Sequence, residues 1–149
     1  MGSSLSASRI SICICTFRRP TLLAQLLESL AALQLSGVAR EIEIIVADND
    51  PANSAREVLQ GWRAPPRFSL IALHVPQANI SLARNATVSA AQGEWIAFID
   101  DDETPQTDWL VQLTSAQQAH SADAVFAPVV PRYVPGTPAW IVHGQYFDR

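Results

Sequence analysis

Four consecutive acidic residues follow an apolar run, and their types and spacing point to chemistry. The run 95–99 reads WIAFI, and directly after it come Asp100, Asp101, Asp102 and Glu103. Carboxylates this close raise each other's pKa and destabilise a fold unless a cation or a phosphate-bound metal offsets them. Mg²⁺ and Mn²⁺ prefer oxygen ligands and bind through one or two carboxylates together with substrate phosphates. The pattern therefore predicts a divalent-cation site, and the alternative is a solvated acidic turn that caps the next helix.

Two other segments carry polar residues where predicted strands end, and a predicted helix carries an arginine. Thr16 follows an apolar run, and Asp48 and Asp50 follow another. Asp48 could accept hydrogen bonds from a base or a sugar, or it could form an Asx turn that ends its strand. Arg84 lies in a predicted helix, where it could pair with a carboxylate or a phosphate, or simply with a surface acid.

The composition excludes several classes of site. The chain has no lysine and no G-x-G among its six glycines, which removes the lysine-containing P-loop, Schiff-base chemistry and the dinucleotide fingerprint. A net charge of -4 argues against nucleic-acid binding, because phosphate contacts need a basic surface. Cys13 and Cys15 alternate along a predicted strand, so we interpret them as core thiols rather than as a disulfide or a zinc site.

The elements that must position these residues alternate along the chain. Periodicity predicts strands over 10–16, 41–48, 68–75, 95–99 and 123–130. It predicts helices over 21–34, from a Ser54 cap to about Trp62, over 80–91 with a stop near Gly93, and over 108–120. Such alternation gives a mostly parallel sheet with helices on both faces, a three-layer α/β/α sandwich. Ligands bind at the carboxyl ends of such strands, where the polar residues converge.

The two ends of the chain differ from this pattern. Residues 1–9 are polar and predict a disordered tail, 10–130 one domain, and 131–149 a proline-rich loop. The polar start lacks the apolar stretch of a signal peptide, and no apolar run reaches the ~18 residues that would span a bilayer. These features favour a cytoplasmic protein.

Residues 10–130 resemble the family 2 glycosyltransferases, which have the Rossmann-like GT-A fold. The matching text is ISICICTFRRPTLLAQLLESL, EIIVADND, NISLARNATVSAAQGEWIAFIDDDE and DWL. It includes a Thr-x-x-Arg after the first strand, an Asp after the second, and D-x-D at a strand end. The segments VADND and DDDET are similar to those of bacterial exopolysaccharide glucosyltransferases of the succinoglycan type.

The resemblance implies a role for each matched residue. Thr16 and Asp48 would hold the uridine of a UDP-sugar, and Arg84 would lie near the base or the phosphates. Asp100 would contact the ribose, and Asp102 would ligate the Mn²⁺ or Mg²⁺ that bridges the diphosphate. Arg18 and Asp101 complete the predicted set of nucleotide-sugar-binding residues.

The resemblance also implies an activity, which is transfer of a hexose, with inversion, from a UDP-sugar to a saccharide acceptor in polysaccharide biosynthesis. UDP-glucose is the favoured donor, the acceptor could be lipid-linked, and the enzyme would work at the inner face of the plasma membrane as a peripheral protein. The family's catalytic Asp or Glu lies well downstream of the metal motif, and no such motif follows residue 130. We therefore expect the base beyond residue 149, with 131–149 leading to an acceptor-side region.

Two alternatives remain open at this stage. One is a non-catalytic fragment that only binds a nucleotide-sugar. The other is a Mg²⁺-dependent phosphatase of the haloacid dehalogenase type, because IDDDET resembles its D-x-D-x-T motif. That motif follows the first strand of such phosphatases and needs a downstream lysine, whereas here it follows the fourth predicted strand and lysine is absent.

Overall fold

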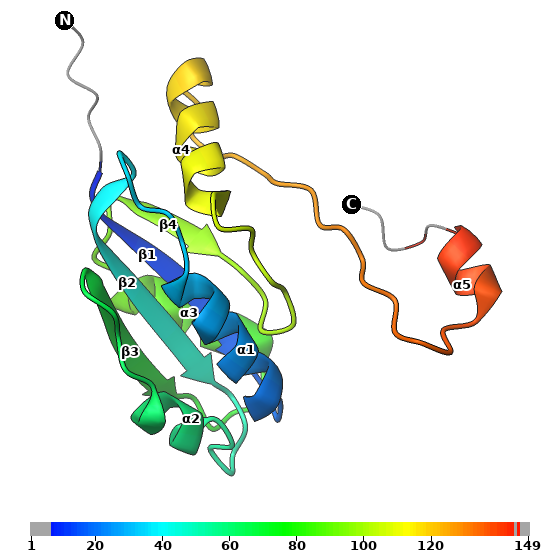
Figure 1. Ribbon diagram of the computed structural model, residues 1–149. Coiled ribbons are helices and arrows are strands. Elements are labelled where there is room, and N and C mark those ends of the chain that lie inside the picture. The colour runs from blue at the N-terminus through cyan, green and yellow to red at the C-terminus, as the bar shows by residue number, and fades with distance from the viewer. Residues whose placement is uncertain (1–6, 145, 147–149) are drawn as a thin grey trace, which may run out of the picture. The chain divides into compact units, whose positions relative to one another are not determined.

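The computed structural model describes residues 7–144 and 146, and it divides after Gln112 into two units that are taken separately below. The first unit contains a four-stranded parallel sheet with the order β3-β2-β1-β4 (Figure 1). Its strands are β1 (Ala7–Thr16), β2 (Ala39–Asp48), β3 (Phe68–His74) and β4 (Trp95–Phe98). Four of the five predicted strands are therefore confirmed.

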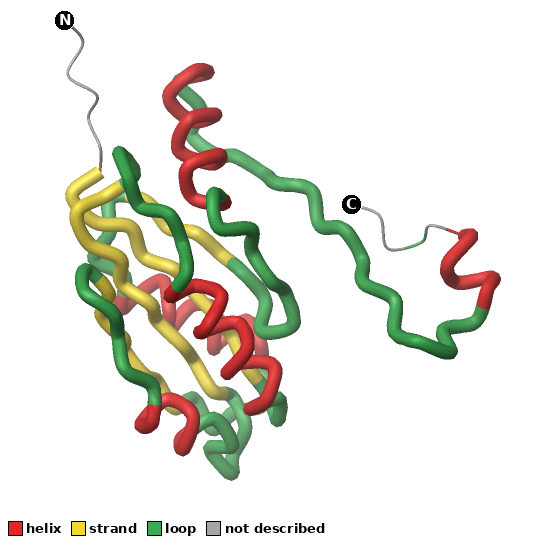
Figure 2. The backbone as a smooth tube through the Cα atoms, in the orientation of Figure 1, coloured by secondary structure: helices red, strands yellow, loops and turns green. Residues whose placement is uncertain are grey.

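Helices connect the parallel strands and cover both faces of the sheet. The connections contain α1 (Pro20–Ala31), α2 (Arg56–Gly61) and α3 (Ile80–Ala90). Figure 2 shows the strands as one layer between helices, and Figure 1 shows α1 and α3 on opposite faces of that layer. The chain moves outward from β1 to β3 and then returns to β4, so right-handed crossovers place the returning helix on the other face. The prediction of a three-layer α/β/α sandwich is confirmed.

The core follows from the apolar patterns in the sequence. The central strands β1 and β2 are buried on both faces, as their runs of isoleucine and valine predict. On α1, the leucine stripe points inward, and its fully buried members are Leu23, Leu26, Leu27 and Leu30.

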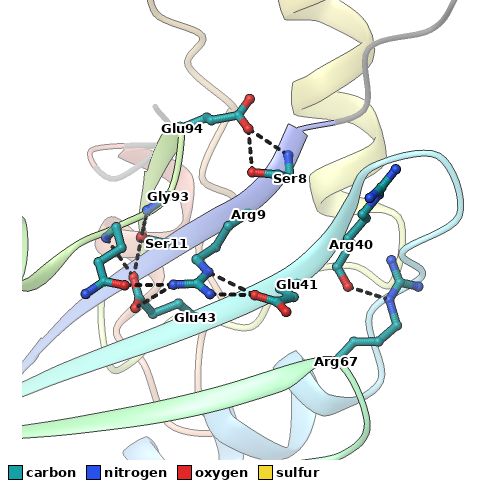
Figure 3. A network of polar contacts seen from close by, with 10 residues as sticks. Ser8, Arg9, Ser11, Arg40, Glu41, Glu43, Arg67, Gly93 and Glu94 are labelled. Atoms are coloured by element: carbon teal, nitrogen blue, oxygen red, sulfur yellow. Dashed lines mark hydrogen bonds and ion pairs between the residues drawn. The ribbon is translucent and has the colours of Figure 1, made fainter.

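A polar network holds the amino-terminal edge of the sheet (Figure 3). The buried carboxylate of Glu43 accepts hydrogen bonds from the Ser11 hydroxyl at 2.7 Å and from the Gln92 N–H at 2.9 Å. The Ser11 hydroxyl in turn accepts the N–H of Gly93 at 2.8 Å. A Cβ at Gly93 would lie 2.5 Å from the Ser11 nitrogen, so only glycine fits the turn that leads into β4.

This network corrects the predicted role of Gly93. The predicted helix over 80–91 is confirmed, since α3 ends at Ala90 with Ala91 as its C-cap, but Gly93 is not the residue that ends it. Gly93 instead allows a close approach of two backbones. The predicted Ser54 cap is also wrong, because the N-cap of α2 is Ala55 and has no side-chain cap hydrogen bond.

The helix predicted over 108–120 is confirmed, but the other elements of the second unit differ from the prediction. Helix α4 (Trp109–His120) begins in the first unit and continues into the second, and a short helix α5 (Ala139–Gly144) lies inside the predicted loop 131–149. The predicted strand over 123–130 is wrong, because these residues form no strand. A strand needs a hydrogen-bonded neighbour, and within the described part of this unit none pairs with the segment, in which Phe126 is 92% exposed.

The limits of the described chain bear on two further expectations. β1 begins at Ala7, three residues before the predicted strand, and residues 1–6 of the predicted tail lie outside the described residues. Among the described helices, none is both long and apolar enough to cross a membrane.

Candidate functional site

A pocket opens at the carboxyl ends of the strands in the first unit. Its volume is about 420 Å³, which is within the range of small-ligand sites. It lies where the strand order reverses between β1 and β4, the position at which open α/β sheets bind ligands. The lining residues come from the ends of β1, β2 and β4 and from the start of α3: Cys15, Thr16, Phe17, Arg19, Asn49, Ala78, Ile80, Asp100, Asp101 and Asp102.

The three aspartates of the acid run occupy different environments. Asp101 is buried, and it accepts the Thr16 hydroxyl at 2.7 Å and an Arg19 N–H at 3.2 Å. Asp102 is half-exposed and accepts a hydrogen bond from Arg19 at 2.9 Å. Asp100 is exposed and lies 3.6 Å from the guanidinium of Arg84. Asp101 is thus fixed in the wall, while Asp100 and Asp102 present carboxylates to solvent and to the pocket.

Two arginines offset the acid run, and this corrects one premise of the sequence argument. We expected that so many adjacent acids would need a divalent cation to be tolerated in the fold. Instead, Arg19 pairs with Asp101 and Asp102, and Arg84 pairs with Asp100. Asp101, followed by Asp102, raises the pKa of the Arg19 guanidinium. The fold therefore supplies its own counter-charges, and the acid run alone is no evidence of a metal.

Asp48 has the structural role that the Asx-turn alternative predicted. Its side chain is fully buried, and its carboxylate accepts the N–H of Asp50 at 2.9 Å and that of Ala55 at 2.7 Å. The bond to Ala55 fixes the N-cap residue of α2. The pocket is lined not by Asp48 but by its neighbour Asn49, because successive side chains at a strand end point in opposite directions.

Arg18 also turns away from the pocket lining. Its backbone has a φ of 57°, its guanidinium lies 3.2 Å from the Asp50 carboxylate, and it stacks over the ring of Phe17 at 4.9 Å. Burial opposes ionisation of Asp50, but the N–H of Ala52 and the Arg18 guanidinium hold the pKa of that carboxyl below its ordinary value. The structure therefore joins Arg18 to the loop after β2.

The structure thus brings together Thr16, Asp100, Asp101 and Asp102 as predicted, with Arg84 paired to the group. Sequence reasoning missed Arg19 and Asn49. The Thr-x-x-Arg spacing marks Arg19, and alternation at the end of β2 separates Asn49 from Asp48, so signals for both were present.

Cys15 lines the pocket as a neutral thiol. Burial raises its pKa to about 11, and Asp100 and Asp101 add to the shift while Arg84 opposes it. The interpretation as core thiols is confirmed for Cys13, which is buried, but not for Cys15, which is half-buried and lines the pocket; both are free.

The oxygen atoms that the pocket offers can hold a hard cation only together with a bound diphosphate. Within the described ranges, no group of three or more histidine, cysteine or acidic side chains could enclose a metal ion. Asp100 and Asp102 offer carboxylate oxygens at the mouth of the pocket. Mg²⁺ and Mn²⁺ are commonly held by one or two carboxylates plus phosphate oxygens and water, so these residues fit such an ion bound together with a diphosphate.

Comparisons with known sequences agree with the resemblance. The family described as glycosyl transferase family 2 matches residues 11–147. The succinoglycan biosynthesis protein ExoM of Rhizobium meliloti (strain 1021) is 42% identical over 137 residues, which are 92% of this chain and 44% of the relative. The putative glycosyltransferase EpsH of Bacillus subtilis (strain 168) is 28% identical over 70% of this chain and 29% of its own length. The chain therefore spans less than half of either relative.

Solved structures share the fold. S. aureus TarS 1-349 in complex with UDP matches with a TM-score of 0.65 and 21% identity, over 83% of this chain and 38% of that one. The mannosyltransferase PcManGT from Pyrobaculum calidifontis, in complex with GDP-Man and Mn2+, matches with a TM-score of 0.63 and 17% identity, over 75% of this chain and 32% of that one. The likeness confirms the GT-A fold.

Proposed function

Because this chain belongs to glycosyl transferase family 2, we propose that its pocket binds the nucleoside diphosphate of a sugar donor together with Mn²⁺ or Mg²⁺. One observation carries the proposal. Asp100 and Asp102 stand at the end of β4, beside a cavity of about 420 Å³ at the topological switch point of the sheet. A phosphate site without a lysine or a glycine-rich loop needs another source of positive charge, and these carboxylates fit a cation that supplies it.

Each residue of the pocket has a role in this proposal. Asp102 holds the cation, and Asp100 accepts hydrogen bonds from the ribose. Thr16, whose hydroxyl bonds the buried Asp101, stays at the uridine end as the resemblance implies, and Arg84 adds positive charge near the base or the phosphates. A bound divalent cation supplies Lewis-acid stabilisation of the charge that develops on the departing diphosphate.

We reassign the uridine end of the pocket from Asp48 to Asn49. The Asp48 carboxylate is buried and already accepts two backbone N–H groups, whereas Asn49 lines the pocket. An amide both donates and accepts, so Asn49 can match the alternating donors and acceptors of a uracil edge. Asp48 then acts by holding the loop that presents Asn49, and the donor-binding role of Arg18 stays a prediction that requires it to leave Asp50.

The wider activity rests on the relatives. ExoM is a succinoglycan biosynthesis protein, and TarS has been solved with UDP and with UDP-GlcNAc. These support a UDP-sugar as the donor and a role in exopolysaccharide biosynthesis. Transfer of a hexose with inversion to a saccharide acceptor, and UDP-glucose as the favoured donor, are our proposals from the resemblance in the sequence. We propose a lipid-linked acceptor and peripheral attachment at the cytoplasmic face of the membrane. Family membership argues against a haloacid-dehalogenase-type phosphatase.

A panel of nucleotides tests the proposal. With Mn²⁺ present, UDP should raise the melting temperature of the full chain more than GDP or ADP, because the uridine end of the pocket discriminates among bases. Equal shifts for all three would contradict the uridine assignment, and no shift with any of them would contradict the donor site.

A transfer assay separates the enzyme from a non-catalytic binding fragment. We expect this chain to bind UDP but to transfer hexose poorly, because the general base that must deprotonate the acceptor is expected beyond residue 149. Efficient transfer by the 149-residue chain would show that the base is already present.

A further inference from the structure

The contacts of Arg19 distinguish two neighbouring carboxylates. One nitrogen, Nη1, lies 3.2 Å from Asp101 and 2.9 Å from Asp102. The Asp101 side chain is 7% exposed and is also held by the Thr16 hydroxyl, whereas the Asp102 side chain is 49% exposed. Asp101 is thus a fixed anchor, and Asp102 is the member of the pair that can change partners.

The chemistry of arginine makes this contact a competitor for a metal site. A guanidinium keeps its charge at any physiological pH, so Arg19 cannot give up Asp102 by losing a proton. Arg19 bonds the Oδ2 oxygen of Asp102, so a divalent cation that uses this oxygen competes with the guanidinium for it and repels it as a like charge. Binding of a cation at Asp102 therefore favours movement of the Arg19 guanidinium away from that carboxylate.

We propose that the Arg19 guanidinium pairs with Asp102 when no donor is bound, and that it pairs with the donor's diphosphate instead once cation and donor bind. We call this the placeholder role of Arg19. This inference rests on the proposed function and adds a residue to it. Arg19 releases Asp102 but keeps its bond to Asp101, which holds the guanidinium in the pocket wall. The guanidinium has five N–H donors in a fork, so those not used by Asp101 can bind phosphate oxygens.

This arrangement couples binding of the cation to binding of the nucleotide. Without a diphosphate, a cation competes with Arg19 and gains few ligands in return. With a diphosphate, the displaced guanidinium finds a new anion, and the coupling is reciprocal, so each ligand strengthens binding of the other. The pocket would then stay charge-balanced when empty and would fill with cation and donor together.

The test measures Mn²⁺ binding without nucleotide, by the loss of the free-ion electron paramagnetic resonance signal. R19Q should bind Mn²⁺ alone about 10-fold more tightly than wild type, because the coupling of two sites is typically worth 5–150-fold. In saturating Mn²⁺, calorimetry should show UDP binding to R19Q weakened by about 10-fold, since a charge-assisted contact to phosphate is lost. R63Q removes the same charge from an exposed arginine that donates to the Gln60 carbonyl at 3.2 Å and lies outside the pocket lining, so it should leave binding of Mn²⁺ alone at the wild-type value.

Further variants keep the test decisive. R19M is a second neutral side chain of similar length, and it replaces R19Q if circular dichroism shows that R19Q is unfolded. R19K keeps a positive charge, so it should resemble wild type toward Mn²⁺ alone but should bind UDP more weakly because a lysine lacks the fork.

The outcomes separate this inference from the proposed function. Unchanged or weaker binding of Mn²⁺ alone by the folded neutral variants would overturn the placeholder role, whatever the UDP result. If wild type binds neither Mn²⁺ nor UDP when both are supplied, the proposed function fails. In that case, a gain in Mn²⁺ affinity by R19Q would still support the competition of Arg19 with the cation for Asp102.

Discussion

At the scale of single residues, the site depends on which of two adjacent side chains faces the pocket. Arg19 faces the acid run while Arg18 faces Asp50, and Asn49 lines the pocket while Asp48 is buried behind it. The sequence predicts that arginine and acidic residues gather at this edge. The Thr-x-x-Arg spacing marks Arg19, but the pairing of Arg18 with Asp50 depends on the left-handed backbone of Arg18, with its φ of 57°, which two consecutive arginines do not reveal.

The hydroxyl of Thr16 should contribute to stability through the buried Asp101. T16V keeps the shape of the side chain but removes the donor to the Oδ2 oxygen of the buried Asp101, while Arg19 still bonds Oδ1. We expect a loss of about 1–3 kcal/mol in the free energy of unfolding, which is the usual cost of an unsatisfied buried group. Urea denaturation measures it, with S29A as a control because the Ser29 hydroxyl bonds on an exposed surface. Equal effects of the two substitutions would contradict the role given to Thr16.

The Cys15 thiol should report on the pocket through its reactivity. Its pKa of about 11 keeps it protonated at neutral pH, and only the thiolate reacts with iodoacetamide. Alkylation in the native protein should therefore be slow at neutral pH and should accelerate as the pH rises toward 11. UDP with Mn²⁺ should protect Cys15, which lines the pocket. Mass spectrometry of the modified peptide, with C15S as the control for Cys13, measures both effects, and rapid alkylation at neutral pH would contradict the assigned pKa.

At the scale of elements, sequence periodicity predicts what positions the site. Isoleucine-rich runs predict β1 and β2, a leucine stripe predicts α1, and their alternation predicts the edge where polar residues converge. The failed strand over 123–130 marks the limit of this reasoning. An apolar run specifies that a segment can be buried, but a strand also needs a neighbour, and periodicity does not provide that information.

The turn between α3 and β4 should depend on Gly93. G93A would place a Cβ 2.5 Å from the Ser11 backbone, so the two strands would have to separate near the Glu43 network. We expect a loss of about 1–3 kcal/mol in the free energy of unfolding, as for other overpacked sites. G61A is the matched control, since nothing lies within 4 Å of a Cβ there. A G93A protein as stable as G61A would show that this close approach is not required.

At the scale of the whole molecule, the first unit already contains a sheet, a core and a pocket. The described chain spans 44% of the length of the succinoglycan biosynthesis relative, and its pocket draws only on residues up to Asp102. Donor binding and acceptor chemistry can therefore be tested separately. The acids have arginine partners within the fold, so their charge alone does not establish the metal.

Calorimetric titration of the 149-residue chain with UDP, with and without Mn²⁺, tests the central claim most directly. In wild type, we predict that UDP binds with Mn²⁺ and at least about 10-fold more weakly without it, a difference of about 1.4 kcal/mol. D102N, which removes the charge of the proposed metal ligand, should abolish the effect of Mn²⁺ while leaving the fold intact. UDP binding that is unaffected by both Mn²⁺ and D102N would contradict the account.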